Sequence, residues 1–276
     1  MKQLCDLHIH SLFSDSDSSL ENIFQSAHKR NLSCIALTDH DTIEGLEEAR
    51  FYSRKFNIEL IEGIELSAKR QGYEIHVLGY FIDASDSMLN KELAEIKSLR
   101  RMRLASMVDR LNSLGLDIDK SDLLASLGES ITTRLHLGLY LVRKGKVGSL
   151  KEVFTKYLSV DKPAYVANCK YSVEEAVALI RRAGGLAFMA HPHLIPDQSW
   201  FCEFAGRGLD GIEINYPGMP QTKKDIYWKI IRDNNLLKSG GSDAHGTYKK
   251  FTHVGKVTVS YEWVKEMKER KGSLNS

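Results

Sequence analysis

Short apolar runs alternate with helical patterns over the first third of the chain. Residues 4–9, 33–37 and 58–64 have the length and apolar character of buried strands, and the last of these runs ends at Glu65. Between them, apolar positions repeat at helical spacing over residues 20–27 and 43–52. Strands and helices that alternate at such short intervals predict parallel strands joined by crossover helices.

The pattern changes in the middle of the chain and then returns. Residues 73–81 predict a further strand that contains His76, but residues 83–163 show only helical spacing. Strand and helix signals resume after Pro163, with strands expected at 186–190, 211–216 and 236–241. We therefore expect an α/β barrel domain formed by residues 1–82 and 164–276, interrupted by a helical insertion domain at 83–163.

The composition of the chain indicates which classes of partner and which cellular location to expect. The net charge of +2 gives no general reason to bind nucleic acid, and the four cysteines form no CxxC pair. Without an apolar run long enough to cross a bilayer, no membrane partner is expected, and the cytoplasm is the expected location. The sequence indicates no obligate protein partner. A basic cluster in the insertion either attracts a polyanionic substrate or forms the solvated side of a helix; it comprises Lys97, Arg100, Arg101, Arg103 and Arg110.

Histidines and acids gather where the predicted strands end. His8 and His10 are two residues apart on a strand, so their side chains point to the same face. Alone, a histidine at a strand end is more often a hydrogen-bonding residue than a ligand. Together, so many polar groups at one barrel mouth would be costly without metal. The candidate ligands are His8, His10, Asp15, His40, Glu65, His76, His191, Asp243 and His245.

The ligand types indicate the ion and the chemistry. Imidazole and carboxylate without thiolate suit manganese, iron or zinc, and this number of ligands implies two or three divalent ions. Glu65 is the natural bridge between two of them. Because clustered ions activate water and neutralise phosphate oxygens, hydrolysis of a phosphate ester is the expected reaction.

The ordered motifs resemble those of the polymerase and histidinol phosphatase (PHP) superfamily. They are Asp-Leu-His-Ile-His at 6–10, Thr-Asp-His-Asp-Thr at 38–42, Gly-Ile-Glu at 63–65, His-Val-Leu-Gly-Tyr at 76–80, Ala-His-Pro at 190–192 and Gly-Ser-Asp-Ala-His at 241–245. The resemblance implies a distorted (β/α)7 barrel with a trinuclear metal centre. It assigns His8, His10, Glu65 and Asp243 to one ion, Glu65, His76 and His191 to a second, and Asp15, His40 and His245 to a third. Asp17 remains an alternative to Asp15, since the usual Asp-Gly is Asp-Ser-Asp here.

The insertion resembles that of bacterial PHP phosphoesterases that act on nucleotides. The similar elements are Thr-Arg-Leu-His-Leu at 133–137 and Lys-Pro-Ala-Tyr-Val at 162–166, although Leu135 replaces the usual proline. By this resemblance Arg134 holds a substrate phosphate, and the substrate is a nucleotide 3′,5′-bisphosphate or the end of a short RNA or DNA oligonucleotide. His193 is expected to contact substrate or to act as the general acid for the leaving alkoxide, or else to be a supporting or surface histidine.

The sequence also suggests supporting roles for three aspartates and leaves other functions possible. Asp6 is expected to support a ligand, and of Asp39 and Asp41 one is expected to orient His40 and the other to cap the following helix. The alternative functions are a phosphatase of a non-nucleotide small molecule such as histidinol phosphate, and a catalytically idle metal-binding PHP module. Metal-dependent amide hydrolysis ranks lower, because no lysine is placed to bridge two metals.

Overall fold

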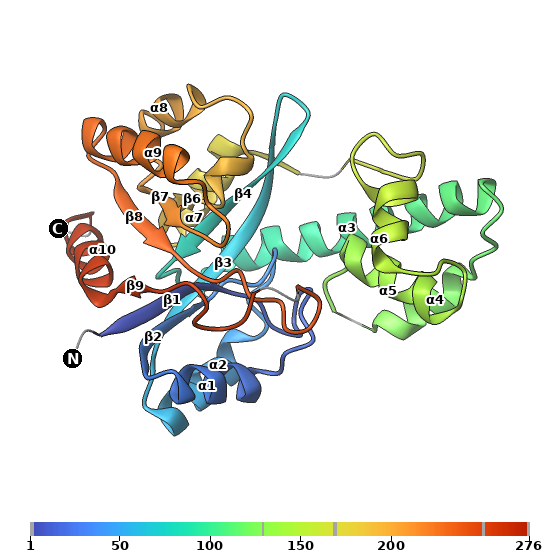
Figure 1. Ribbon diagram of the computed structural model, residues 1–276, viewed down its shortest axis with the longest axis horizontal. Coiled ribbons are helices and arrows are strands. Elements are labelled where there is room, and N and C mark those ends of the chain that lie inside the picture. The colour runs from blue at the N-terminus through green and yellow to red at the C-terminus, as the bar shows by residue number, and fades with distance from the viewer. Residues whose placement is uncertain (1–2, 129, 168–169, 250–251, 275–276) are drawn as a thin grey trace. The chain divides into compact units, whose positions relative to one another are not determined.

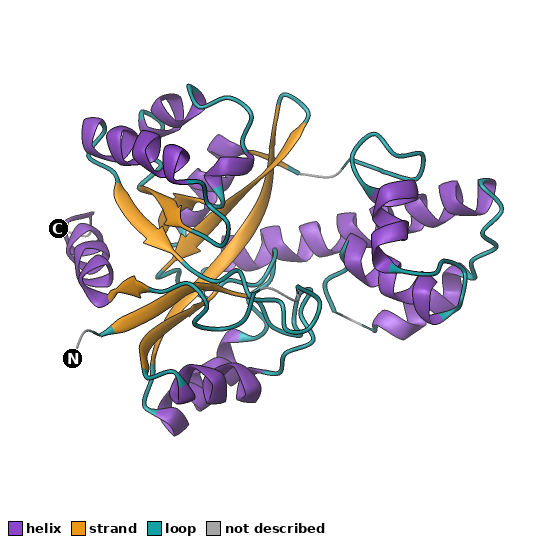
Figure 2. Cartoon of the chain, viewed as in Figure 1, coloured by secondary structure: helices purple, strands orange, loops and turns teal. Residues whose placement is uncertain are grey.

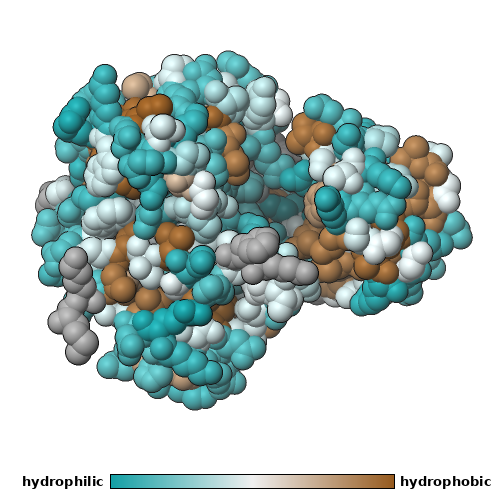
Figure 3. Space-filling model, in the orientation of Figure 1, coloured by the Kyte–Doolittle hydropathy of each residue, from teal (hydrophilic) through white to brown (hydrophobic). Residues whose placement is uncertain are grey.

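The first three strands form the parallel arrangement that the alternating pattern predicts. Strands β1 (Leu4–Ile9), β2 (Leu32–Leu37) and β3 (Glu59–Arg70) pair side by side in parallel. Helices α1 (Leu20–Lys29) and α2 (Leu46–Phe56) connect them and lie next to each other in Figure 1. Ser19 caps α1 by accepting a hydrogen bond from the amide of Asn22, and the predicted apolar stripe of this helix is buried. The surface over α1 and α2 is mostly hydrophilic (Figure 3).

Strand β3 is longer than predicted and reverses direction into β4 (Tyr73–Tyr80). The two strands form an antiparallel hairpin in which Glu65 pairs with Leu78 and Ser67 pairs with His76. The prediction that Glu65 lies at a strand end is therefore wrong. Residues 66–70 continue the strand beyond Glu65. Their backbone groups form hydrogen bonds with β4 on one side and with β5 (Tyr171–Ser172) on the other.

The remaining strands complete a nearly closed barrel, as the fold prediction requires (Figure 2). Strand β6 (Leu186–Met189) pairs antiparallel with β4, and β7 (Gly211–Asn215) and β8 (Leu237–Gly240) follow in parallel. The other elements of this part are α7 (Val173–Arg182), the 3-10 helix η2 (Pro192–Leu194), α8 (Trp200–Ala205), α9 (Gln221–Asp233), β9 (Val259–Ser260) and α10 (Tyr261–Leu274).

The segment after β8 closes the barrel against β1. The amide of Asp243 donates to the His8 carbonyl at 2.8 Å, and the amide of His10 donates to the Ala244 carbonyl at 3.0 Å. A side chain at Gly241 would lie 2.3 Å from the His8 nitrogen, so only glycine permits this approach. Closure therefore brings the two ends of the sheet, with the motifs at 6–10 and 241–245, into direct contact.

This structure, a computed structural model, describes residues 3–128, 130–167, 170–249 and 252–274. It divides into two compact units, residues 1–91 with 171–276, which contain the barrel, and residues 92–170. The domain prediction places the insertion at 83–163.

Across the described ranges, no helix combines the length and apolar character that a bilayer span needs. Cys5, Cys34 and Cys202 carry free thiols, and Cys169 lies outside the described residues.

The second unit is helical and has its own core. Helix α3 (Ser87–Ser113) leads into it and is followed by α4 (Lys120–Leu127), α5 (Arg134–Arg143), α6 (Leu150–Val153) and the π-helix η1 (Phe154–Leu158). Leu104, Val108, Leu123, Leu137 and Leu141 are among the side chains buried in this core. The unit thus has its own packed interior.

Most arginines of the basic cluster on α3 donate hydrogen bonds to backbone carbonyls of the helical unit. Arg100 and Arg103 are buried, and they donate to the carbonyls of Thr132 (3.1 Å) and Val166 (2.8 Å). The solvated-helix interpretation is wrong for these two arginines. Arg101 and Arg110 also donate to backbone carbonyls. These side-chain to backbone hydrogen bonds hold the loops of the unit to α3.

Candidate metal centre

Four candidate ligands converge at the bottom of the barrel mouth. The Nε2 atoms of His8 and His10 lie 3.1 Å apart, and each lies 3.1–3.2 Å from Oε2 of Glu65. Oδ1 of Asp243 lies 3.2 Å from the His10 atom and 3.5 Å from the His8 atom. Four ligands about 2.1 Å from one ion in a tetrahedron lie about 3.4 Å from one another. The arrangement therefore fits a single divalent ion, with the four residues that the resemblance assigns to it.

The two carboxylate oxygens of Glu65 lie close to different histidines. Oε2 faces His8, His10 and His40, with His40 Nδ1 at 3.3 Å. Oε1 lies 3.1 Å from Nδ1 of His76 and 3.0 Å from Nε2 of His191. The Glu65 side chain is only 1% exposed. A buried carboxylate with five imidazole nitrogens this close has the environment expected of a bridge between two ions.

A third group surrounds Asp15. Its carboxylate lies 3.2 Å from Nε2 of His245 and 3.8 Å from both His10 and His40. Asp17 instead accepts hydrogen bonds from the amide and hydroxyl of Thr247. Of the two acids that the sequence left open, Asp15 is the one within the cluster. Asp17 ties the loop after β1 to the loop after β8.

The electrostatics of the cluster fit cation binding. Burial alone would raise the pKa of Glu65, but His40, His8 and His76 outweigh it and hold this pKa well below its ordinary value. Burial lowers the pKa of His10, whereas Asp243 and Glu65 raise it to about 9. The Nδ1 atom of His10 is buried and has no hydrogen-bond partner among the described residues.

Sequence reasoning missed Glu213, which lies at the centre of β7. This fully buried carboxylate accepts a hydrogen bond from Nδ1 of His8 at 2.9 Å and from the amide of His191 at 2.7 Å. His191 has a φ of 28°, in the left-handed region that non-glycine residues rarely adopt. Glu213 thus orients one candidate ligand and stabilises the strained backbone of another. The signal in the sequence was an acid flanked by isoleucines in an apolar strand.

The supporting aspartates hold backbone segments. Asp6 accepts hydrogen bonds from the amide and hydroxyl of Ser242 at 2.8 and 2.6 Å, which agrees with a supporting role. Asp39 accepts from Ser11 and Ser14, and Asp41 accepts from the amide of Ser67. The prediction that one of the latter pair caps the following helix is wrong, because α2 begins at Leu46 with Gly45 as its cap.

The two predicted substrate contacts lie in different units. The ring centroid of His193 is 4.9 Å from that of Tyr216, and its Nδ1 atom is buried without a partner in the part of the chain that the structure describes. Arg134 begins α5 in the helical unit, where its guanidinium lies over the ring of Tyr165 at 5.5 Å. Both roles remain predictions.

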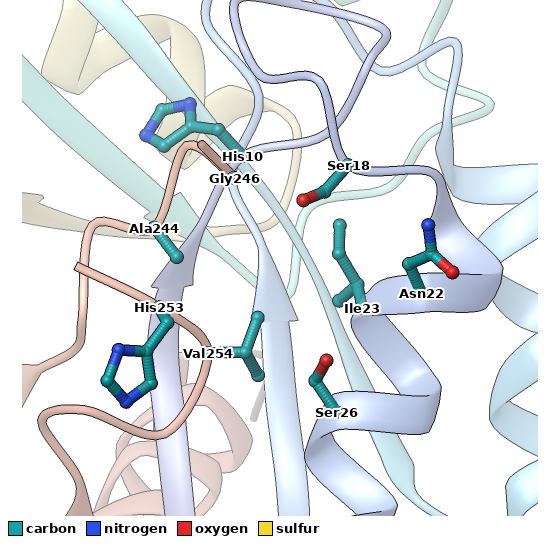
Figure 4. Close-up of a pocket in the computed structure, with 9 residues that line it drawn as sticks. All are labelled: His10, Ser18, Asn22, Ile23, Ser26, Ala244, Gly246, His253 and Val254. Atoms are coloured by element: carbon teal, nitrogen blue, oxygen red, sulfur yellow. The ribbon is translucent and has the colours of Figure 1, made fainter. Parts of the chain in front are cut away.

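A small pocket adjoins the cluster between α1 and the loop after β8 (Figure 4). Ser18, Asn22 and His253 are among its lining residues, and the ring of His10 points away from Asn22. Its volume of about 160 Å³ is below the roughly 300–1,000 Å³ of small-molecule sites. This pocket is therefore too small to accommodate a nucleotide.

The chain is similar to several known proteins. A 5′-3′ exoribonuclease of Haemophilus influenzae is 32% identical over 250 residues, covering 89% of this chain and 91% of the relative. A 3′,5′-nucleoside bisphosphate phosphatase of Chromobacterium violaceum is 32% identical over 255 residues, covering 87% and 86%. The solved structure of a metal-dependent phosphoesterase of Bifidobacterium adolescentis superposes with a TM-score of 0.87 at 28% identity, covering 95% and 94%. Residues 6–162 match the PHP domain family. The resemblance seen in the motifs is thus confirmed, and the chain belongs to the PHP family of metal-dependent phosphoesterases.

Proposed function

We propose that this enzyme hydrolyses phosphate esters of nucleotides, namely nucleotide 3′,5′-bisphosphates or the ends of short oligonucleotides. The observation that carries the chemistry is Glu65, whose two oxygens face five imidazole nitrogens at 3.0–3.3 Å. The observation that favours nucleotides is the pair of relatives at 32% identity, which are named for an exoribonuclease and for a nucleoside bisphosphate phosphatase.

The donor set suits two or three ions of manganese, iron or zinc. When bound, such ions supply an activated water and neutralise the charge of a phosphate group. His8, His10, Glu65 and Asp243 would hold one ion, Glu65, His76 and His191 a second, and Asp15, His40 and His245 a third. A cytoplasmic location remains a prediction.

His193 would contact the substrate. Burial and the neighbouring His191 lower its pKa, so the ring is mostly neutral at neutral pH. A neutral imidazole is a weak proton donor, which favours contact with the substrate over the general-acid role. The helical insertion would select the substrate, with Arg134 holding a phosphate through its guanidinium group.

The test is a phosphatase assay with manganese across three substrates: an adenosine 3′,5′-bisphosphate, a 5′-phosphorylated short oligoribonucleotide and histidinol phosphate. We expect release of phosphate or mononucleotide from the first two at least tenfold faster than from the third. Hydrolysis of histidinol phosphate alone would overturn the nucleotide assignment. Metal-loaded protein that cleaves no phosphate ester at all would instead favour the idle metal-binding module.

A further inference from the structure

The two carboxylate oxygens of Asp243 contact different groups, histidines on one oxygen and Tyr216 and Lys249 on the other. Its Oδ1 atom faces the histidines, at 3.2 Å from His10 and 3.4 Å from His245. Its Oδ2 atom accepts a hydrogen bond from the hydroxyl of Tyr216 at 2.6 Å and from Nζ of Lys249 at 2.7 Å. A lysine ammonium therefore lies within hydrogen-bond distance of a candidate metal ligand.

Lys249 reaches the cluster from the solvent side. Its side chain is 44% exposed, whereas that of Asp243 is 4% exposed and His8 and His10 are fully buried. The backbone leading to it is fixed, since Asp17 accepts a hydrogen bond from the amide of Thr247 and the amide of Tyr248 donates to the His245 carbonyl. An incoming molecule can thus meet this ammonium at the rim before it meets the buried ligands.

A cation at this position is unfavourable for metal binding itself. An ammonium group beside a metal ligand repels divalent cations and competes with them for the carboxylate. The same charge is favourable for a phosphate dianion that sits next to the ions, because a lysine acts as a strong point-charge partner for phosphate. The position suits substrate binding better than it suits metal retention.

We propose that Lys249 is a substrate-binding residue whose ammonium group holds an oxygen of the phosphate being cleaved. The proposal rests on the proposed phosphoesterase function and adds a phosphate contact from the barrel unit itself. The competing role, in which Lys249 only anchors Asp243 as a ligand, makes the opposite prediction for metal affinity, because loss of an anchor weakens metal binding.

The test compares Lys249→Gln and Lys249→Arg with a control, Lys265→Gln, which removes an exposed lysine that pairs with Glu262 on α10. Manganese affinity of metal-free protein and inorganic phosphate affinity of manganese-loaded protein are measured by calorimetry, together with KM. For Lys249→Gln we expect phosphate affinity to fall at least tenfold and KM to rise, with manganese affinity unchanged or higher. Lys249→Arg should retain most of the phosphate affinity, and Lys265→Gln all of it.

Two results would overturn the proposal: unchanged phosphate affinity in Lys249→Gln, or a loss of manganese affinity in that variant. Thermal unfolding of each variant confirms that the protein is folded before binding is measured. A wild-type protein that binds manganese and phosphate but cleaves no ester would refute the proposed function, while the phosphate measurements would still decide the role of Lys249.

Discussion

Glu213 accepts a hydrogen bond from Nδ1 of His8 at 2.9 Å, with both side chains fully buried. This contact fixes the tautomer of His8, because a proton on Nδ1 leaves Nε2 free to bind an ion. The second oxygen of Glu213 accepts from the amide of His191. One carboxylate thereby sets the geometry of two candidate ligands that lie on β1 and after β6.

We predict that Glu213→Gln lowers metal affinity by about 10–100-fold. Glutamine keeps the shape but offers one acceptor oxygen, so its NH2 group would face either the proton on His8 or the amide of His191. Metal content after dialysis against a fixed free manganese concentration measures the effect. Glu62→Gln is the matched control, since Glu62 also lies on a strand but pairs with Arg50 at a partly exposed site. Equal metal content in the two variants would contradict the prediction.

We further predict that Glu65→Gln nearly abolishes activity. The change removes the charge that faces five imidazole nitrogens, so at least one ion should be lost. Losing several kcal/mol of transition-state stabilisation corresponds to a drop in kcat of about 10³-fold or more. Elemental analysis should show fewer ions per chain than in the wild type. Full metal content together with wild-type kcat would exclude Glu65 as a bridge.

Local patterns in the sequence were enough to locate the ligand pool. His8 and His10 alternate with apolar residues on a strand, and His191 follows the apolar run at 186–190. The two-residue period and the length of the apolar runs therefore predicted that these histidines lie at the ends of strands. The antiparallel hairpin was not predicted, because residues 66–70 extend β3 by pairing with β4 and β5, which lie further along the sequence. Glu213 was missed for a similar reason: its partners are 205 and 22 residues away, and no local pattern encodes them.

The barrel closure gives a prediction about stability. Gly241→Ala would place a Cβ 2.3 Å from the nitrogen and 2.6 Å from the Cβ of His8, and these backbone-bound atoms cannot move aside cheaply. We expect a loss of about 1–3 kcal/mol in the free energy of unfolding, as for other overpacked sites. Metal content should fall too, because the neighbouring Asp243 is held through its amide to His8.

The matched control for this change is Gly272→Ala in α10, where the space around the glycine is open. Alanine is the better helix former, so this variant should be as stable as the wild type or more stable by up to about 1 kcal/mol. Chemical denaturation of both variants in their metal-free forms separates packing from metal binding. A Gly241→Ala protein as stable as Gly272→Ala would mean that the strand ends can separate without cost.

Finally, we predict that metal affinity increases with pH. In the metal-free protein, burial lowers the pKa of His10 and His76, but the carboxylates of Asp243 and Glu65 raise that of His10 to about 9, and those of Glu65 and Glu74 raise that of His76 to about 10. Both rings are therefore protonated at neutral pH and must lose a proton before they can bind an ion. Affinity should rise about tenfold per pH unit for each proton released.

Calorimetric titration with manganese at pH 7, in two buffers of different ionisation enthalpy, counts these protons directly. We expect two to three protons to be released, because burial lowers the pKa of His8 but Glu213, Glu65 and Asp243 raise it well above its ordinary value, as for His10 and His76. The carboxylates should release none, because the histidines and Lys249 already hold the pKa values of Glu65 and Asp243 well below the ordinary range against the effect of burial. An observed enthalpy that is the same in both buffers would show that the histidines are already neutral, and that the carboxylates do not control their protonation.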